Sequence, residues 1–280
     1  MSFYDASLAR TDDSFFAVHQ SARDLHNLLR CIYVKEKKKC VTMTIYESGM
    51  RFIVTGNTVQ ANAYLKSTLF SEFDLRVDGV LALNVPLLEF MESLNLIGTS
   101  GAYVTMRIQG PGSKLELVMR DLNFEVTTQI QTFVAETNLD FNFPVTDIIA
   151  KAVVQTRTLR DVMKSIELGS FTVTLRIRPD EFEIVHGSET LSCRTLYPRT
   201  SLEVDEVKLY GNTPCINVQY GASFFKRMQT AISIGVKTSF MISNQLMLNT
   251  QVTVPQTDKQ TVYVEFFHMP ESDTSIPPPT

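Results

Sequence analysis

A unit made of one short strand, one amphipathic helix and a run of further strands occurs four times in this 280-residue sequence. The pattern predicts helices over Ser21–Ile32, Pro86–Leu96, Thr158–Leu168 and Ala222–Ile232. Their first residues lie about 65 to 70 residues apart, which exceeds the roughly 20 to 50 residues of a solenoid repeat. Four evenly spaced helices in a strand-rich chain predict two similar domains, each built from two similar halves.

The helix starts and apolar positions follow ordinary physical rules. Ser21 is a suitable N-cap, and the acidic Asp24 three residues later completes a variant of the capping box. Leu25, Leu28 and Leu29 then recur at helical spacing, so one face of this helix is apolar. The segments between the helices alternate apolar and polar residues, which is typical of half-buried strands. We therefore predict an α+β fold in which helices lie on one face of antiparallel sheets.

The pattern is interrupted once, at residues 134–147, where Pro144 cannot take part in a strand ladder. We interpret this segment as a connector between an N-terminal domain over 1–133 and a C-terminal domain over 148–270. Residues 271–280 end in three prolines, and we expect a disordered tail there.

Composition excludes several classes of protein. Hydrophobic residues make up 44% and charged residues 20%, as expected of a globular chain. No apolar run approaches the roughly 18 to 20 residues of a membrane helix, and no secretory signal is visible, so we expect no membrane partner. The net charge of −4 argues against a uniformly basic nucleic-acid coat. The four cysteines show no metal-ligand spacing, which favours free thiols in the cytosol or nucleus.

Signatures of catalysis are missing from the sequence. We find no G-x-S-x-G, GxxxxGK[ST], H-E-x-x-H or G-x-G-x-x-G motif. The carboxylate pairs Asp12–Asp13 and Asp205–Glu206 are better explained as solvated surface charge, because neighbouring residues of a strand point to opposite faces. We expect no catalytic residue, no metal site and no cofactor.

Basic residues recur on the exposed faces of three of the four predicted helices. They are Arg23 and Arg30 on the first, Arg157, Arg160 and Lys164 on the third, and Lys226 and Arg227 on the fourth. The second helix differs because it carries Glu89 and Glu92 and no basic residue. Solubility alone explains an exposed basic residue, but the repetition in an acidic chain indicates a surface that faces phosphates. Such contacts position a protein on nucleic acid without reading its sequence.

Four segments carry a resemblance to a known family. The strand–helix–three-strand unit, present twice per domain, resembles the sliding clamps of the proliferating cell nuclear antigen family. Within that family, four segments are similar to the Rad-one subunits of the checkpoint clamp, the nine-one-one complex: Val59–Leu65, Leu69–Phe73, Leu139–Phe143 and Val262–Phe267. The resemblance spans about residues 14 to 272.

The resemblance implies a non-catalytic subunit of a ring of three different subunits, the others being relatives of Rad-nine and Hus-one. The ring would enclose double-stranded DNA in the nucleus and serve as a platform for checkpoint adaptors and repair enzymes. A separate clamp loader would consume ATP, so the chain itself would need no cofactor. Lys164 would take the place of a basic inner-helix residue, with the other helix cations as its neighbours. The acidic second helix departs from a uniformly basic lining.

The resemblance also implies two further kinds of site. Edge strands over about Phe124–Phe133 and Thr190–Leu196 would join neighbouring subunits, since an exposed edge invites pairing. The residues concerned are Phe124, Val126, Thr128 and Ile130, and Thr190, Ser192, Arg194 and Leu196. The connector residues Leu139, Phe141 and Phe143 would border a groove for client peptides, although their aromatic rings could equally be buried for structural reasons.

Two other functions remain open at this point. A 3′ to 5′ exonuclease has been proposed for members of this family and would need several carboxylates converging on metal ions. A homotrimeric processivity clamp for replication polymerases would share the fold but assemble with copies of itself.

Overall fold

The computed structural model describes residues 13–33, 39–56, 59–96, 102–122, 124–135, 141, 143–167 and 169–270. They form two compact units. The first unit comprises residues up to 54 together with 63–138, and the second comprises residues 55–62 together with those from 139 onward. No helix of the described residues is long and apolar enough to cross a membrane.

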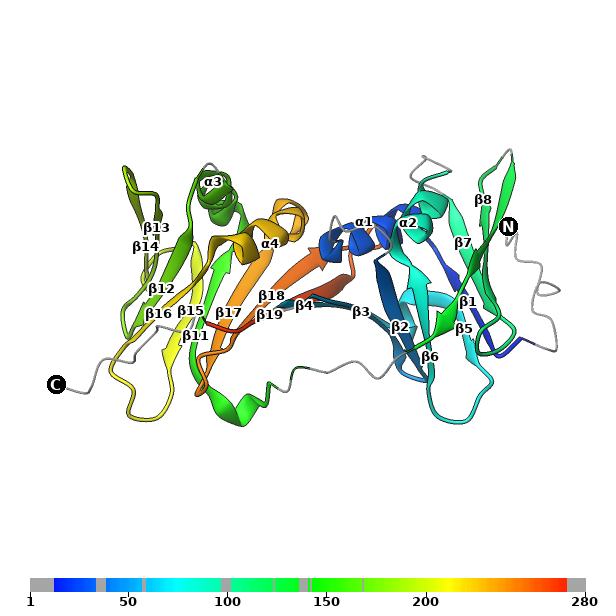
Figure 1. Cartoon of the computed structure of the whole chain (residues 1–280), viewed down its shortest axis with the longest axis horizontal. Coiled ribbons are helices and arrows are strands. Elements are labelled where there is room, and N and C mark those ends of the chain that lie inside the picture. Colours follow the sequence, from blue (N-terminus) through cyan, green and yellow to red (C-terminus); the bar gives the residue numbers. More distant parts are fainter. Residues whose placement is uncertain are drawn as a thin grey trace. The chain divides into compact units, whose positions relative to one another are not determined.

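The first unit contains two helices and two groups of antiparallel strands (Figure 1). The helices are α1 (Ala22–Ile32) and α2 (Leu87–Asn95), and a short 3-10 turn is η2 (Ser67–Leu69). The strands are β1 (Phe15–His19), β2 (Cys40–Tyr46), β3 (Gly49–Thr55), β4 (Val59–Lys66), β5 (Phe70–Leu75), β6 (Leu81–Pro86), β7 (Tyr103–Ile108), β8 (Lys114–Arg120), β9 (Glu125–Gln131) and β10 (Phe133–Val134). They lie in the orders β5-β1-β7-β8-β9 and β10-β6-β2-β3-β4. Of these strands, Thr55 of β3 and residues 59–62 of β4 are counted with the second unit.

The second unit repeats this arrangement. Its helices are α3 (Thr156–Glu167) and α4 (Ala222–Ile234), with a 3-10 turn η3 (Val145–Asp147). Its strands are β11 (Ile148–Gln155), β12 (Thr172–Arg178), β13 (Glu181–Gly187), β14 (Ser192–Pro198), β15 (Val204–Leu209), β16 (Ile216–Gly221), β17 (Lys237–Ser243), β18 (Leu248–Pro255) and β19 (Thr261–His268). They lie in the orders β15-β11-β17-β18-β19 and β14-β13-β12-β16.

Each helix follows one strand and precedes three consecutive strands, as the sequence predicts. The two halves of a unit are nevertheless interlocked. The strand before one helix pairs with the first strand after the other helix: β1 with β7 and β6 with β2 in the first unit, and β11 with β17 and β16 with β12 in the second. Each sheet therefore contains strands from both halves. The α+β prediction of antiparallel sheets with four helices is confirmed.

The helices form where the sequence predicts because their signals are local. The hydroxyl of Ser21 accepts a hydrogen bond from the Asp24 N–H at 3.1 Å, which satisfies a donor that the first turn would otherwise leave without a partner. The apolar face of α1 is fully buried at Leu25, Leu28 and Leu29. Burying each such side chain is worth roughly 1.5–3 kcal/mol, an amount that depends on the tertiary contacts of the face.

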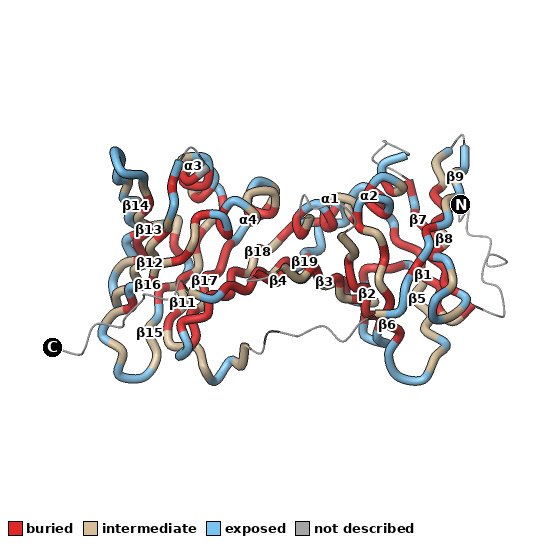
Figure 2. The backbone as a smooth tube through the Cα atoms, viewed as in Figure 1, coloured by how far each residue is buried: buried red, intermediate tan, exposed pale blue. Residues whose placement is uncertain are grey.

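Helix boundaries differ from the prediction where tertiary contacts act. Helix α3 begins at Thr156, two residues early, and the Thr156 hydroxyl lies 2.8 Å from that of Thr238 on β17 in a buried hydrogen bond. Pro86 ends strand β6, opposite Cys40, and α2 starts one residue later. Residue burial differs among the strands of the second unit. Figure 2 shows that β17 and β18 are largely buried, whereas β14 is more exposed.

Candidate nucleic-acid and subunit interfaces

Helices α3 and α4 contact each other in the second unit and carry five of the predicted DNA-facing residues (Figure 1). Arg157, Arg160 and Lys164 are exposed on α3, Lys226 is exposed on α4, and Arg227 is half-buried there. The acidic residues of these two helices are Asp161 and Glu167. The pair is therefore net positive, which is the electrostatic condition for binding phosphates.

All three α3 cations also have partners within the unit. Arg157 donates from Nε to Glu203 at 2.9 Å, and this hydrogen bond raises the pKa of Arg157 and lowers that of the Glu203 carboxyl. Lys164 Nζ lies 3.0 Å from Asp161. By contrast, Lys226 forms no ion pair with any described residue. Asp161, three residues before Lys164, could have been noticed in the sequence, whereas Glu203 could not.

Arg160 joins the two helices. Its Nε and Nη2 donate to the Ile232 and Gly235 carbonyls at 3.5 and 3.3 Å, at the C-terminal end of α4. A cation is favourable there because the last carbonyls of a helix lack partners and carry partial negative charge. Arg160 thus has a structural role that its sequence position did not reveal.

The helix pair of the first unit is electrostatically mixed. Arg23 and Arg30 are exposed on α1, while Glu89 and Glu92 are exposed on α2. Burial, and then the nearby Arg30, lower the pKa of His26 on α1, so its imidazole is biased toward the neutral form. The two units therefore present helix pairs of different charge.

The first predicted subunit contact lies on strand β9, which ends its sheet. Phe124 precedes the strand and is exposed, Val126 and Thr128 are half-buried, and Ile130 is buried. The predicted contact residues within β9 therefore alternate with the exposed residues of the same strand. Exposed apolar residues flank the strand: Leu122, Phe124, Phe133 and Val134.

The second predicted contact lies on β14, which ends the other unit's smaller sheet. Thr190 precedes the strand, and Ser192, Arg194 and Leu196 are all exposed on it. Leu191 is exposed nearby. Strand edges with unpaired backbone groups and adjacent apolar side chains are suited to pairing with another chain.

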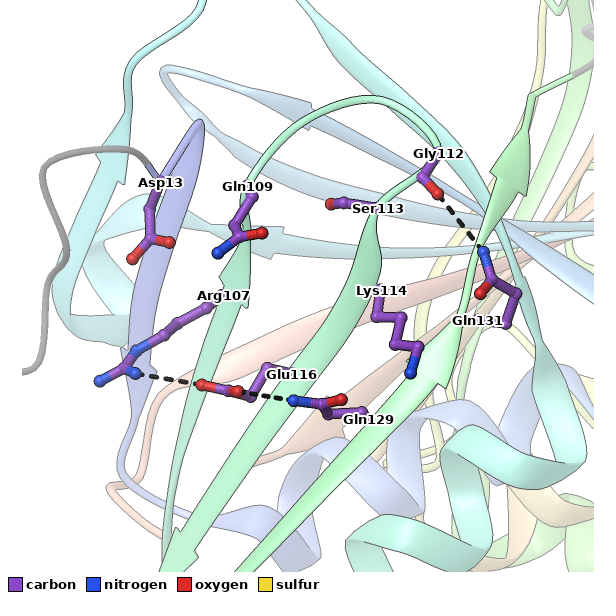
Figure 3. Close-up of a pocket in the computed structure, with 9 residues that line it drawn as sticks. All are labelled: Asp13, Arg107, Gln109, Gly112, Ser113, Lys114, Glu116, Gln129 and Gln131. Atoms are coloured by element: carbon purple, nitrogen blue, oxygen red, sulfur yellow. Dashed lines mark hydrogen bonds and ion pairs between the residues drawn. The ribbon is translucent and has the colours of Figure 1, made fainter.

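A polar row crosses the strands next to the β9 edge (Figure 3). Arg107 Nη1 lies 3.1 Å from Glu116, and the Gln129 amide donates to the same carboxylate at 3.1 Å. The row borders a hollow of about 330 Å³ whose lining also includes Asp13 and Lys114. Because Gln129 lies on β9, the row brings polar groups to the edge itself. Sequence analysis did not identify this row.

The predicted client-peptide groove is only partly described. Leu139 lies outside the described residues. Phe141 and Phe143 are half-buried, and their rings lie 6.4 and 6.0 Å from that of Phe267 on β19. Both aromatic residues thus pack within the second unit while retaining some exposed surface.

Groups of three or more His, Cys, Asp or Glu side chains that could hold a metal ion do not occur within the described ranges. Of the histidines, His186 is buried against the Ser170 hydroxyl at 3.0 Å, and His268 stacks on Phe224 with ring centroids 4.5 Å apart. All four cysteines are free thiols.

Comparisons with solved structures show the fold. Proliferating cell nuclear antigen (PCNA) from Thermococcus kodakaraensis aligns with a TM-score of 0.75 at 15% identity, covering 92% of this chain and all of that one. The PCNA2–PCNA3 complex from Sulfolobus tokodaii aligns with a TM-score of 0.72, also at 15% identity and with the same coverage. The predicted sliding-clamp fold is confirmed.

Comparisons of sequence show the family. The chain is 25% identical over 268 residues to the human Cell cycle checkpoint protein RAD1, covering 93% of both chains. It is 21% identical over 229 residues to the Caenorhabditis elegans RAD1 homolog mrt-2, covering 81% of this chain and 84% of the relative. The family model described as "Repair protein Rad1/Rec1/Rad17" matches residues 14–254. The chain therefore belongs to the Rad1/Rec1/Rad17 family of repair proteins.

Proposed function

We propose that this chain is a non-catalytic subunit of a heterotrimeric ring clamp in the nucleus. With a Rad-nine-like and a Hus-one-like subunit it encircles double-stranded DNA, and a separate clamp loader places the ring. The ring is a platform for checkpoint adaptors and repair enzymes. The observation that carries this proposal is membership of the Rad1/Rec1/Rad17 family together with the sliding-clamp fold.

The charge of the helices supports DNA as the enclosed partner. The α3–α4 pair is net positive in a chain whose total charge is −4. We assign the DNA contacts to Arg157, Arg160, Lys164, Lys226 and Arg227 in the second unit and to Arg23 and Arg30 in the first. Cations spread over helices suit loose, salt-sensitive contacts that allow a ring to move along DNA.

The strand edges support assembly with other subunits. We assign subunit contacts to β9 and β14, since both end a sheet and have exposed apolar residues nearby. Similarity to checkpoint proteins named RAD1, together with the sliding-clamp fold, favours this function over the exonuclease and over the homotrimeric processivity clamp.

The test distinguishes enclosure from ordinary binding. The chain is co-purified with the two candidate subunits, and the complex is loaded onto nicked circular DNA by the clamp loader with ATP. After gel filtration at high salt, we expect the complex to stay on the circle and to leave once the circle is cut. Salt disrupts phosphate contacts but not a topological link. Equal retention on circular and linear DNA would contradict the proposal.

The same complex tests the absence of catalysis. We expect a 3′-labelled duplex incubated with the complex and Mg²⁺ or Mn²⁺ to keep its label. Loss of label that co-purifies with the chain would establish a nuclease instead.

A further inference from the structure

A cluster of arginines lies on the second unit's smaller sheet, on the face turned away from the core. Along β12 the residues Val173, Leu175 and Ile177 are buried, so the alternating Arg176 and Arg178 point to the opposite face. Arg194 on β14 points to the same face.

The three arginines surround one buried carboxylate, that of Glu183 on β13. Its side chain is 0% exposed, whereas those of Arg176, Arg178 and Arg194 are 38%, 43% and 58% exposed. Arg176 Nη1 lies 3.5 Å and Arg178 Nη1 3.9 Å from the carboxylate, and Arg194 contacts it through Nε. A molecule approaching from solvent therefore meets guanidinium groups above the Glu183 carboxylate, with the partly exposed carboxylate of Glu181 beside Arg178.

Glu183 holds these side chains in place without using most of their donors. Neither of its oxygens accepts an aligned hydrogen bond, so the attraction is mainly Coulombic. Each guanidinium has five N–H donors. Arg176 uses Nε on Asn217 at 3.1 Å, and Arg178 uses Nη1 on Glu181. The Nη2 groups of both arginines have no hydrogen-bond partner in the part of the chain that the structure describes.

Arg176 and Arg178 also line a hollow of about 360 Å³, together with Cys215, Ile216 and Asn217. This volume lies within the roughly 300–1,000 Å³ of small-ligand sites. Two arginines two residues apart on one strand face lie about 7 Å from each other, so one oxyanion group between them can accept hydrogen bonds from both.

We propose that this hollow binds the phosphate of a phosphorylated serine or threonine on a partner protein. Two guanidinium forks offer bidentate hydrogen bonds to a doubly charged, three-oxygen group. DNA fits less well, because its charge repeats along the backbone and its neighbouring phosphates would meet the exposed Asp180 in the turn beyond Arg178. The proposal goes beyond the clamp function and does not depend on ring formation.

The test uses the full chain labelled with ¹⁵N and a fluorescein-labelled Gly/Ala peptide that contains one phosphothreonine. We expect NMR shifts confined to β12, the start of β16 and the Arg176 and Arg178 side chains, and none with the unphosphorylated peptide. Arg178→Gln should weaken binding in fluorescence anisotropy by about tenfold or more, the effect of losing one charge-assisted hydrogen bond. Arg176 and Arg194 still neutralise Glu183 in that variant, and an unchanged melting temperature checks its fold.

Arg120→Gln is the matched control, because Arg120 is a half-exposed strand arginine ion-paired with Glu125 in the other unit. It should leave binding unchanged. Arg178→Lys keeps the charge but not the fork and should bind with intermediate affinity. Three results would each overturn the proposal: equal binding of the unphosphorylated peptide, unchanged affinity in a folded Arg178→Gln variant, or a short DNA duplex that shifts the same signals more strongly at equal phosphate concentration.

Discussion

His26 reports the local electrostatics of α1. Burial and Arg30, one turn away, lower its pKa from an ordinary value of about 6.5. We predict that Arg30→Gln raises this pKa, though not fully to 6.5, because burial is the larger cause. NMR titration of the imidazole measures it. Arg23→Gln, an exposed arginine on the same helix, is the control and should change it less. An equal or larger shift in the control would show that Arg30 is not the relevant charge.

The same pKa shift predicts how stability depends on pH. A histidine whose pKa is lower in the folded state binds more protons when the chain is unfolded. Its contribution to the free energy of unfolding is therefore present above the pKa of the unfolded state and is lost as the pH falls. His26 and the buried His186 both have lowered pKa values. We therefore expect the free energy of unfolding to fall between about pH 7 and pH 5, as urea titrations would measure. His186→Gln should reduce this pH dependence, and an unchanged slope would contradict the assignment.

Arg160 separates structure from DNA binding on α3. Arg160→Gln removes the contacts with the last carbonyls of α4 and should lower the free energy of unfolding by about 0.5–1 kcal/mol. Lys164→Gln loses only an exposed ion pair and should change it little. Urea denaturation of both variants provides the comparison. Equal stabilities would mean that the Arg160 contacts contribute nothing measurable.

At the scale of elements, the α3–α4 pair is where we expect most of the phosphate attraction. Lys226→Glu combined with Lys164→Glu should weaken binding of the assembled clamp to DNA at low salt. It should also reduce the slope of log K against log salt concentration by about one for each phosphate that the variant no longer neutralises. Lys259→Glu, at an exposed lysine in the turn between β18 and β19, is the control. If the control has the same effect, net charge rather than this helix pair determines binding.

Strand β9 is the element that we expect to pair with another subunit. Neighbouring N–H groups in a strand point to opposite sides, so one of Thr127→Pro and Thr128→Pro removes a bond to β8 and the other a donor at the free edge. The variant that loses only the donor at the free edge should keep its melting temperature. We predict that this variant no longer co-purifies with its partner subunit. A folded variant that still binds normally would show that β9 is not a subunit interface.

For the whole molecule, the heteromeric proposal predicts the mass of the isolated chain in solution. The isolated chain should be a monomer of 31.6 kDa in light scattering, because β9 and β14 are proposed to pair with different subunits. A stable trimer of this chain would favour the homotrimeric clamp.

The four helices and the fourfold repeat could be predicted from local sequence alone. Helical spacing, N-caps and Pro86 act within a few residues, so these signals are complete in the local sequence. The cations of the proposed DNA surface were also visible as a pattern, whereas the strands that end the sheets were expected only from the resemblance to sliding clamps. The likeness to sliding clamps followed from the same order of elements.

Which strands pair and which charged side chains meet could not be predicted from the sequence and followed from the fold. The exchange of strands between halves joins residues far apart, such as Phe16 with Arg107 and Ile177 with Ile216. Arg157 meets Glu203 across 46 residues, and Glu183 becomes buried beneath three arginines that its own segment does not predict. Sheet pairing and ion pairing depend on distances set by the folded chain, because neither has a fixed separation in sequence.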